Sequence, residues 1–200
     1  MRPDMPRKAV ILAGGRGTRL APFTSVFPKP LVPVGDMPIL EIVVRQLIAA
    51  GFDEVTLTLG YLGELIQAFF KEHKKLSSQI KINFVTEETP TGTAGSLPLV
   101  PGLDDTFLVM NGDVLTTLDF QALLQRHLDS GAALTVAGHR KKVQIDLGVL
   151  ELDEHDGRVT GFTEKPEYVF PVSMGVYVYE PRALEYIPKG EYYDFPSLVL

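Results

Sequence analysis

The chain has 200 residues, a formal net charge of −6 and no cysteine. This length suits one globular domain with a substantial core, the negative charge argues against a nucleic-acid-binding protein, and the absence of cysteine excludes disulfide bonds and thiolate metal sites. Residues 1–8 are too polar and proline-rich for a signal peptide, and no apolar run is long enough to span a membrane. The default expectation is a soluble, cytoplasmic protein.

Apolar segments typical of strands alternate with segments of helical periodicity in the first part of the sequence. Strands are predicted over 9–12, 54–59, 80–85 and 107–110. Helices are predicted over 36–50, 61–70 and 119–128. Asp36 should be the N-cap of the first helix, with Pro38 in its first turn. This alternation predicts a parallel sheet with helices on both faces.

From Ala132 onward, the pattern changes to strands with little helix between them. These strands are expected over 133–136, 148–152, 159–162 and 174–179, and they should extend the sheet. Residues 139–142 are predicted to form a solvated loop.

Three segments that follow predicted strands should lie together. With right-handed crossovers, the carboxyl ends of parallel strands meet at one edge, where ligands of open α/β sheets bind. Residues 13–34, 86–95 and 111–113 each follow such a strand. The sequence therefore predicts one site built from all three.

A glycine-rich segment follows the first strand. Gly14, Gly15 and Gly17 allow a tight turn that exposes N–H groups on one side, which suits phosphate oxygens. Positive charge for a triphosphate comes from Arg16, Arg19 and Lys29. The segment contains Thr18-Arg19-Leu20 where a P-loop needs Lys-Ser/Thr, and four prolines between residues 22 and 33 forbid the helix of a dinucleotide fingerprint.

The fixed positions of this segment are Gly14-Gly15-x-Gly17-Thr18-Arg19-Leu20-x-Pro22-x-Thr24 and Pro28-Lys29-Pro30-Leu31-x-Pro33-Val34. This pattern resembles the opening of the sugar-nucleotide pyrophosphorylases, or sugar-1-phosphate nucleotidyltransferases. The resemblance implies a Rossmann-like nucleotidyltransferase fold with a mixed, mostly parallel central sheet, helices on both faces and extra strands forming a sugar-side lid. It implies one domain over 1–200, with a nucleotide-binding part over 1–130 and a sugar-binding part over 131–200.

The implied reaction transfers a nucleotidyl group from a nucleoside triphosphate to a sugar 1-phosphate with Mg²⁺ as cofactor, releasing pyrophosphate. The sequence does not fix the oligomeric state, and a homo-oligomer is compatible with it. By resemblance Arg19, Lys29 and Asp113 are the catalytic residues. Asn111-Gly112-Asp113 suits either a strand-ending turn or a Mg²⁺ site, with Asp113 as the metal ligand. The implied nucleotide contacts near the phosphates are Ala13, Gly14, Gly15, Arg16, Gly17, Thr18 and Gly112.

Residues 86–95 suit either a solvated loop or, by resemblance, the loop that faces the nucleobase. Gly92 matches the family's glycine, which puts Glu87 at the base-reading position. A carboxylate can accept from guanine N1–H and N2–H, and Gly92-Thr93-Ala94-Gly95 looks most like mannose-1-phosphate guanylyltransferases. We therefore expect GTP and mannose-1-phosphate, with a uridylyl-, cytidylyl- or thymidylyltransferase acting on glucose-1-phosphate or a related sugar phosphate as the alternative.

The sugar side is implied by Glu164 and Lys165, in a segment that would otherwise be an ordinary surface turn. In the family, such a Glu-Lys-Pro supplies a carboxylate to sugar hydroxyls and an ammonium to the sugar phosphate. Gly148 and Tyr177 match further sugar-side positions, whereas Leu147 stands where the family often has an aromatic residue.

Family members usually carry a second metal-binding Asp well past the segment that corresponds to Asp194-Phe195-Pro196, and the sequence has no residue for it. We therefore expect a fragment of a longer protein. A non-catalytic nucleotide-sugar-binding or regulatory subunit is the rival interpretation.

Overall fold

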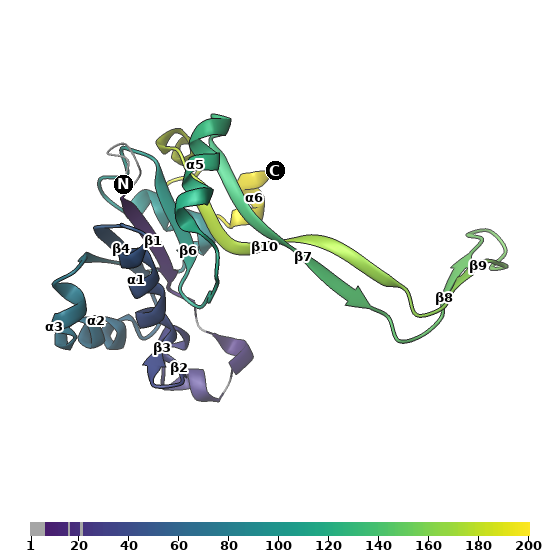
Figure 1. Ribbon diagram of the computed structural model, residues 1–200, viewed down its shortest axis with the longest axis horizontal. Coiled ribbons are helices and arrows are strands. Elements are labelled where there is room, and N and C mark those ends of the chain that lie inside the picture. Colours follow the sequence, from purple (N-terminus) through teal and green to yellow (C-terminus); the bar gives the residue numbers. More distant parts are fainter. Residues whose placement is uncertain (1–6, 16, 21) are drawn as a thin grey trace. The chain divides into compact units, whose positions relative to one another are not determined.

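The computed structural model describes residues 7–15, 17–20 and 22–200, apart from the side chain of Arg19 (Figure 1). It divides into two compact units. One contains the residues up to Val136 together with Gly175–Leu200, and the other is Ala137–Met174.

The first unit is built on a sheet of six strands in the order β5-β4-β1-β6-β10-β7. The strands are β1 (Lys8–Ala13), β4 (Glu54–Leu59), β5 (Lys81–Thr86), β6 (Phe107–Asn111), β7 (Leu134–Gln144) and β10 (Glu167–Tyr179). Strand β1 pairs in parallel with β4 and β6, and β4 pairs in parallel with β5, whereas β10 runs antiparallel to β6. The expected mixed, mostly parallel sheet is confirmed.

The helices include one at each of the three positions where the sequence predicts helical periodicity. They are α1 (Ile39–Ala49), α2 (Gly63–Glu72), α3 (Lys74–Ser77), α4 (Gly92–Gly95), α5 (Phe120–Ser130) and α6 (Phe195–Val199). Short 3₁₀ turns lie at Thr18–Leu20, Phe23–Ser25, Lys29–Leu31, Leu97–Leu99 and Pro181–Tyr186. Helix α5 begins where the sequence predicts, because the side chain of Asp119 accepts a hydrogen bond from the Ala122 N–H at 3.0 Å.

Both faces of the sheet are covered. One face carries a buried cluster in which Val10, Val109 and Tyr177 pack against residues 94–103 and 183–187. Alternate strand residues, such as Ile11 and Met110, point the other way. Helices α1 and α5 lie on that second face (Figure 1). The rings of Phe52 and Phe120 pack edge to face there, with their centroids 6.4 Å apart.

The predicted start of the first helix is wrong. Strands β2 (Pro33–Val34) and β3 (Met37–Pro38) form a small antiparallel hairpin around Gly35-Asp36, with Gly35 at φ +66°. Asp36 therefore lies in a two-residue turn, and Pro38, in extended geometry, precedes the first turn of α1. The helix begins at Ile39.

The predicted loop over 139–142 is also wrong, because these residues lie within β7. The ammonium of Lys142 pairs with the carboxylate of Glu167 in β10 at 2.8 Å, which raises the pKa of Lys142. A run of exposed basic residues resembles a loop in sequence, but pairing with a neighbouring strand makes it a strand.

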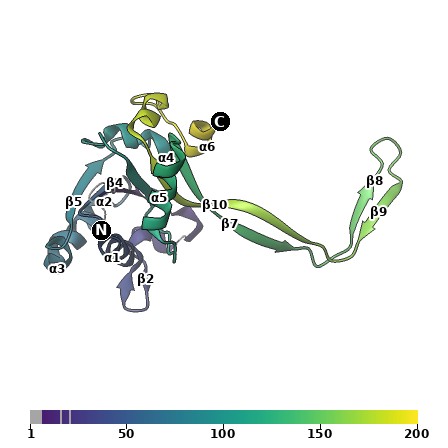
Figure 2. The ribbon, with the colours of Figure 1, turned by 45° about the horizontal axis from the view of Figure 1, so that its top comes forward.

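The second unit has little core of its own. Besides parts of β7 and β10, it contains β8 (Val149–Leu152) and β9 (Val159–Thr163), which form a separate antiparallel hairpin (Figure 2). The prediction that these two strands extend the main sheet is wrong, because among the described strands they pair only with each other. Among residues 137–174, all of which the structure describes, Ala137 alone is buried. Across the described parts of both units, the helices are too short or too polar to cross a membrane.

Candidate functional site

Four segments leave the sheet at one edge. In the parallel registers Ala13 pairs with Leu59, Leu59 with Thr86, and Leu12 with Asn111, so the carboxyl ends of β1, β4, β5 and β6 lie side by side. The segments that begin at Gly14, Gly60, Glu87 and Gly112 therefore start at this edge. The sequence-based argument placed three of these segments there, and the structure brings them together.

The backbone at Gly14 lies against two of the other segments. A Cβ atom on Gly14 would lie 3.1 Å from Glu87 Oε1 and 3.3 Å from the Gly60 nitrogen. A Cβ on Gly60 would lie 2.8 Å from the Gly14 carbonyl oxygen. Sequence reasoning missed Gly60, although its position directly after the strand over 54–59 was a usable signal.

The glycine-rich segment folds back on Lys29. Gly17 has φ +59°, and a Cβ there would lie 3.0 Å from Lys29 Cβ and 3.0 Å from Thr24 Cγ2. The Thr24 hydroxyl donates to the Gly17 carbonyl at 2.9 Å and closes the turn. Only glycine fits this left-handed, crowded position without strain.

Lys29 and Asp113 form an ion pair across the edge, with side chains 33% and 31% exposed. The turn that carries Asp113 is held by a hydrogen bond of 2.9 Å from the Gly112 N–H to the Leu12 carbonyl. Two of the three predicted catalytic side chains thus meet, although they are 84 positions apart in the chain.

The other predicted phosphate contacts are described in part. Ala13 is buried at the end of β1, a Cβ on Gly15 would meet no described atom within 4 Å, and Thr18 is exposed. The backbone of Arg19 lies in the 3₁₀ turn Thr18–Leu20. Its side chain and all of Arg16 lie outside the described residues.

The carboxylate of Glu87 is held within its own loop. Its Oε2 atom accepts from the Thr91 N–H at 2.9 Å and from the Thr91 hydroxyl at 2.7 Å. The loop then passes through Gly92, which has φ +83° and leaves room for the Tyr193 carbonyl, 2.6 Å from where a Cβ would lie. Sequence reasoning gave Thr91 no role.

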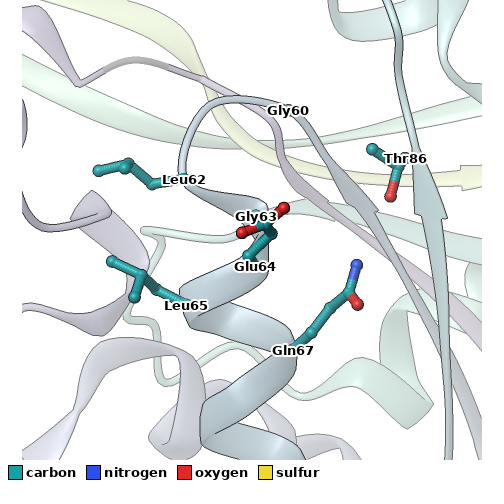
Figure 3. Close-up of a pocket in the computed structure, with 7 residues that line it drawn as sticks. All are labelled: Gly60, Leu62, Gly63, Glu64, Leu65, Gln67 and Thr86. Atoms are coloured by element: carbon teal, nitrogen blue, oxygen red, sulfur yellow. The ribbon is translucent and has the colours of Figure 1, made fainter.

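A surface hollow of about 550 Å³ lies on the α2 side of the same edge, lined by Gly60, Leu62, Gly63, Glu64, Leu65, Gln67 and Thr86. In Figure 3, Leu62 and Leu65 lie on one side of α2, and Gln67 lies on the other side, facing the strand that carries Thr86. The hollow includes neither Lys29 nor Asp113. The predicted catalytic pair therefore lies outside this hollow.

Comparison with known proteins identifies the family of this chain. The Nucleotidyl transferase family model matches residues 8–197. The chain is 37% identical over 200 residues to a mannose-1-phosphate guanylyltransferase from Mycobacterium tuberculosis, and 34% identical over 216 residues to a UTP–glucose-1-phosphate uridylyltransferase from Synechocystis. Each alignment covers 96% of this chain and 55% of the relative. The chain belongs to the nucleotidyl transferase family.

A solved structure of HddC from Yersinia pseudotuberculosis gives a TM-score of 0.71 at 27% identity, covering 94% of this chain and 83% of that one. The same protein complexed with GMP-PN gives a TM-score of 0.68. The resemblance to sugar-nucleotide pyrophosphorylases is thereby confirmed. The present nucleotidyl transferase chain spans about half the length of the curated relatives it matches.

Nucleotidyl transferases of this family generally use a divalent metal. In the described part of the chain, no three acidic, histidine or cysteine side chains come together as a preformed metal site. Mg²⁺ usually takes only one or two carboxylates, with phosphate oxygens and water completing its shell. The partly exposed Asp113 carboxylate fits a site that substrate phosphates would complete.

The residues predicted to bind the sugar fall in both units. Tyr177, in the first unit, is 7% exposed, and its ring lies 3.9 Å from that of Phe195, so its visible role is packing. In the second unit, Gly148 leaves room for the Phe162 ring, which would be 2.3 Å from a Cβ there. Glu164 and Lys165 are exposed, and Lys165 has φ +44°. Their sugar contacts stay predictions.

Proposed function

We propose that this chain carries the transfer step of a sugar-1-phosphate nucleotidyltransferase. The observation that carries the proposal is the Lys29–Asp113 pair, held beside the Gly14–Gly17 turn at the carboxyl edge of the sheet. The turn supplies room and N–H groups for phosphates, the ammonium supplies positive charge, and the carboxylate supplies a ligand for a hard cation.

In the proposed step an oxygen of the sugar 1-phosphate attacks the α-phosphorus of the nucleoside triphosphate. A bond forms between these atoms, the bond from the α-phosphorus to the bridging oxygen breaks, and pyrophosphate leaves with the bonding pair. The nucleophile is already anionic, so the chain needs no general base. Lys29 orients the α-phosphate and offsets its developing charge, and Arg19 holds the departing pyrophosphate. Mg²⁺, when bound at Asp113, would neutralise further phosphate charge.

The proposed substrates are GTP and mannose-1-phosphate, with Glu164 directed at the sugar hydroxyls and Lys165 at the phosphate group. The choice of guanine as the base is supported by Glu87, whose Oε1 atom faces the glycine turn. It is also supported by the sequence identity to a mannose-1-phosphate guanylyltransferase and to a protein solved with GMP-PN. A uridylyltransferase acting on glucose-1-phosphate is the second candidate, because of the 34% identity to the Synechocystis enzyme.

Pyrophosphate release with Mg²⁺ tests this function directly. GTP, UTP, CTP, dTTP and ATP would each be paired with mannose-1-phosphate and with glucose-1-phosphate. Release with GTP and mannose-1-phosphate supports the proposal, and release with UTP supports the second candidate. Nucleotide binding without any release would contradict the enzymatic proposal and favour a regulatory subunit.

Lys29→Ala should lower turnover by roughly 10²–10³-fold, because it removes a positive charge that the transition state needs. Arg19→Ala should have a similar effect. The matched control is Lys189→Ala, because Lys189 is exposed, lies in the turn before Gly190 and belongs to none of the four segments that begin at the sheet edge. Turnover that is unchanged in Lys29→Ala would exclude this assignment. A thermal unfolding scan would show that the variants remain folded.

A further inference from the structure

We propose that Thr91 is a positioning residue that sets the nucleobase preference by fixing the carboxylate of Glu87. The inference rests on the proposed function, since it assigns Glu87 to the base. In this proposal Thr91 does not contact the base itself. Its hydrogen bonds determine which carboxylate oxygen of Glu87 is left to bind the base.

Both donors of Thr91 go to one oxygen. The backbone N–H lies 2.9 Å and the hydroxyl oxygen 2.7 Å from Glu87 Oε2. A carboxylate oxygen has two lone pairs, so these donors saturate Oε2. Oε1 accepts no hydrogen bond from the described residues, and it lies toward Gly14, 3.1 Å from where a Cβ would be. One oxygen is anchored and the other faces the phosphate-binding turn.

Thr91 is itself rigidly held. The residue is 7% exposed, and its carbonyl accepts a hydrogen bond from the Tyr193 N–H at 2.8 Å. Gly92, next in the chain, packs its backbone against the Tyr193 carbonyl. A buried hydroxyl with one partner has little freedom to turn elsewhere, because an unsatisfied buried donor is costly. The orientation of the carboxylate is therefore fixed before a ligand arrives.

A fixed single acceptor discriminates among bases by their donors. Guanine presents N1–H and its 2-amino group side by side, and both can point at Oε1. Uracil and thymine present one N–H between two carbonyl oxygens, which a carboxylate repels. Adenine and cytosine place an acceptor nitrogen beside their amino group. A freely turning carboxylate would relax this discrimination, so the Thr91 hydroxyl should contribute to selectivity for guanine.

The test compares Thr91→Val, which keeps the shape and removes the hydroxyl, with Thr91→Ser, which keeps the hydroxyl. Dissociation constants for GTP and UTP would be measured by calorimetry on the full chain without sugar phosphate. We expect Thr91→Val to weaken the binding of GTP about tenfold and that of UTP little, so that the preference for GTP over UTP falls. Thr91→Ser should restore that preference. Thr93→Val is the loop control, because the Thr93 hydroxyl accepts from the Phe195 N–H and does not contact Glu87.

If Thr91 had a purely structural role, Thr91→Val would weaken the binding of GTP and UTP equally and would lower the melting temperature in parallel. Equal losses, a larger loss for UTP, or failure of Thr91→Ser to restore the ratio would each overturn the inference. A shifted GTP/UTP ratio in a chain that releases no pyrophosphate would support Thr91 positioning and reject the proposed reaction. Absence of nucleotide binding by the unaltered chain would overturn both.

Discussion

Gly92 combines two demands that only glycine meets. Its φ of +83° lies in the left-handed region, and the Tyr193 carbonyl occupies the space of a Cβ at 2.6 Å. The same carbonyl accepts from the N–H groups of Ala94 and Gly95, at 3.1 and 2.9 Å. The loop over 86–95 and residues 191–195 therefore depend on one small residue.

Gly92→Ala should destabilise the protein by about 3 kcal/mol, because backbone strain and a steric clash add together. Gly190→Ala is the control: the φ of Gly190 is +77°, and no described atom lies within 4 Å of the Cβ position. It should cost only about 1 kcal/mol. Urea unfolding of both variants measures the two effects. Equal losses would show that the contact with Tyr193 contributes nothing.

At the scale of elements, the sheet is joined at the amino end of β6 by a buried polar network. His127 of α5 is 1% exposed, and its ring nitrogens lie 2.7 Å from the Thr135 hydroxyl and 3.0 Å from Glu180 Oε1. The Thr106 hydroxyl, just before β6, donates to the same Glu180 oxygen at 2.6 Å. The network connects α5, β6, β7 and the end of β10.

This network predicts a specific dependence of stability on pH. Burial by itself would raise the pKa of Glu180, but the hydrogen bonds from Thr106 and His127 outweigh it and lower the pKa below its usual 4.5. Because the folded value is the lower one, the contribution of Glu180 is present above pH 4.5 and is lost as pH falls through the lowered pKa.

Glu180→Gln should therefore reduce the free energy of unfolding by about 1 kcal/mol near neutral pH, and the difference from wild type should vanish in acid. Urea unfolding of both proteins between about pH 3 and pH 7 measures this difference. Other carboxyl groups titrate equally in both proteins and cancel. A difference that is constant with pH would contradict the role of the charge.

At the scale of the whole molecule, the two units differ in how they are stabilised. The first unit contains side chains of zero exposure on β1, β4 and β6, such as Val10, Leu57 and Leu108. In the second unit every residue except Ala137 is at least partly exposed. Local opening takes less free energy where few apolar side chains are buried.

Native-state hydrogen exchange should show this contrast. Amides of β1, β4 and β6 should be the slowest, opening near the global free energy of unfolding, whereas those of β8 and β9 should exchange at least about 100-fold faster. Only backbone amides within paired strands would be compared, so that the amides of both units are in the same kind of secondary structure. Equal protection in β8 and β1 would contradict the expectation.

Several features followed from the sequence alone, because local patterns determine them. Apolar runs specify buried strands, and helical periodicity specifies α1, α2 and α5, including the start of α5 near Asp119. Parallel strands imply a common carboxyl edge, which located the segments after β1, β5 and β6. The sequence resemblance then named Lys29 and Asp113 before any contact between them was visible.

Only the tertiary structure decided which distant groups meet. Lys29 pairs with Asp113 because β1 and β6 are neighbours, and Tyr177 is buried because β10 joins β6 on the same sheet. The hairpin around Asp36 replaced a predicted helical turn, and the hydroxyl of Thr91 acquired a role through Glu87. Local periodicity reports which face of an element is buried, but strand order and loop closure determine what it is buried against.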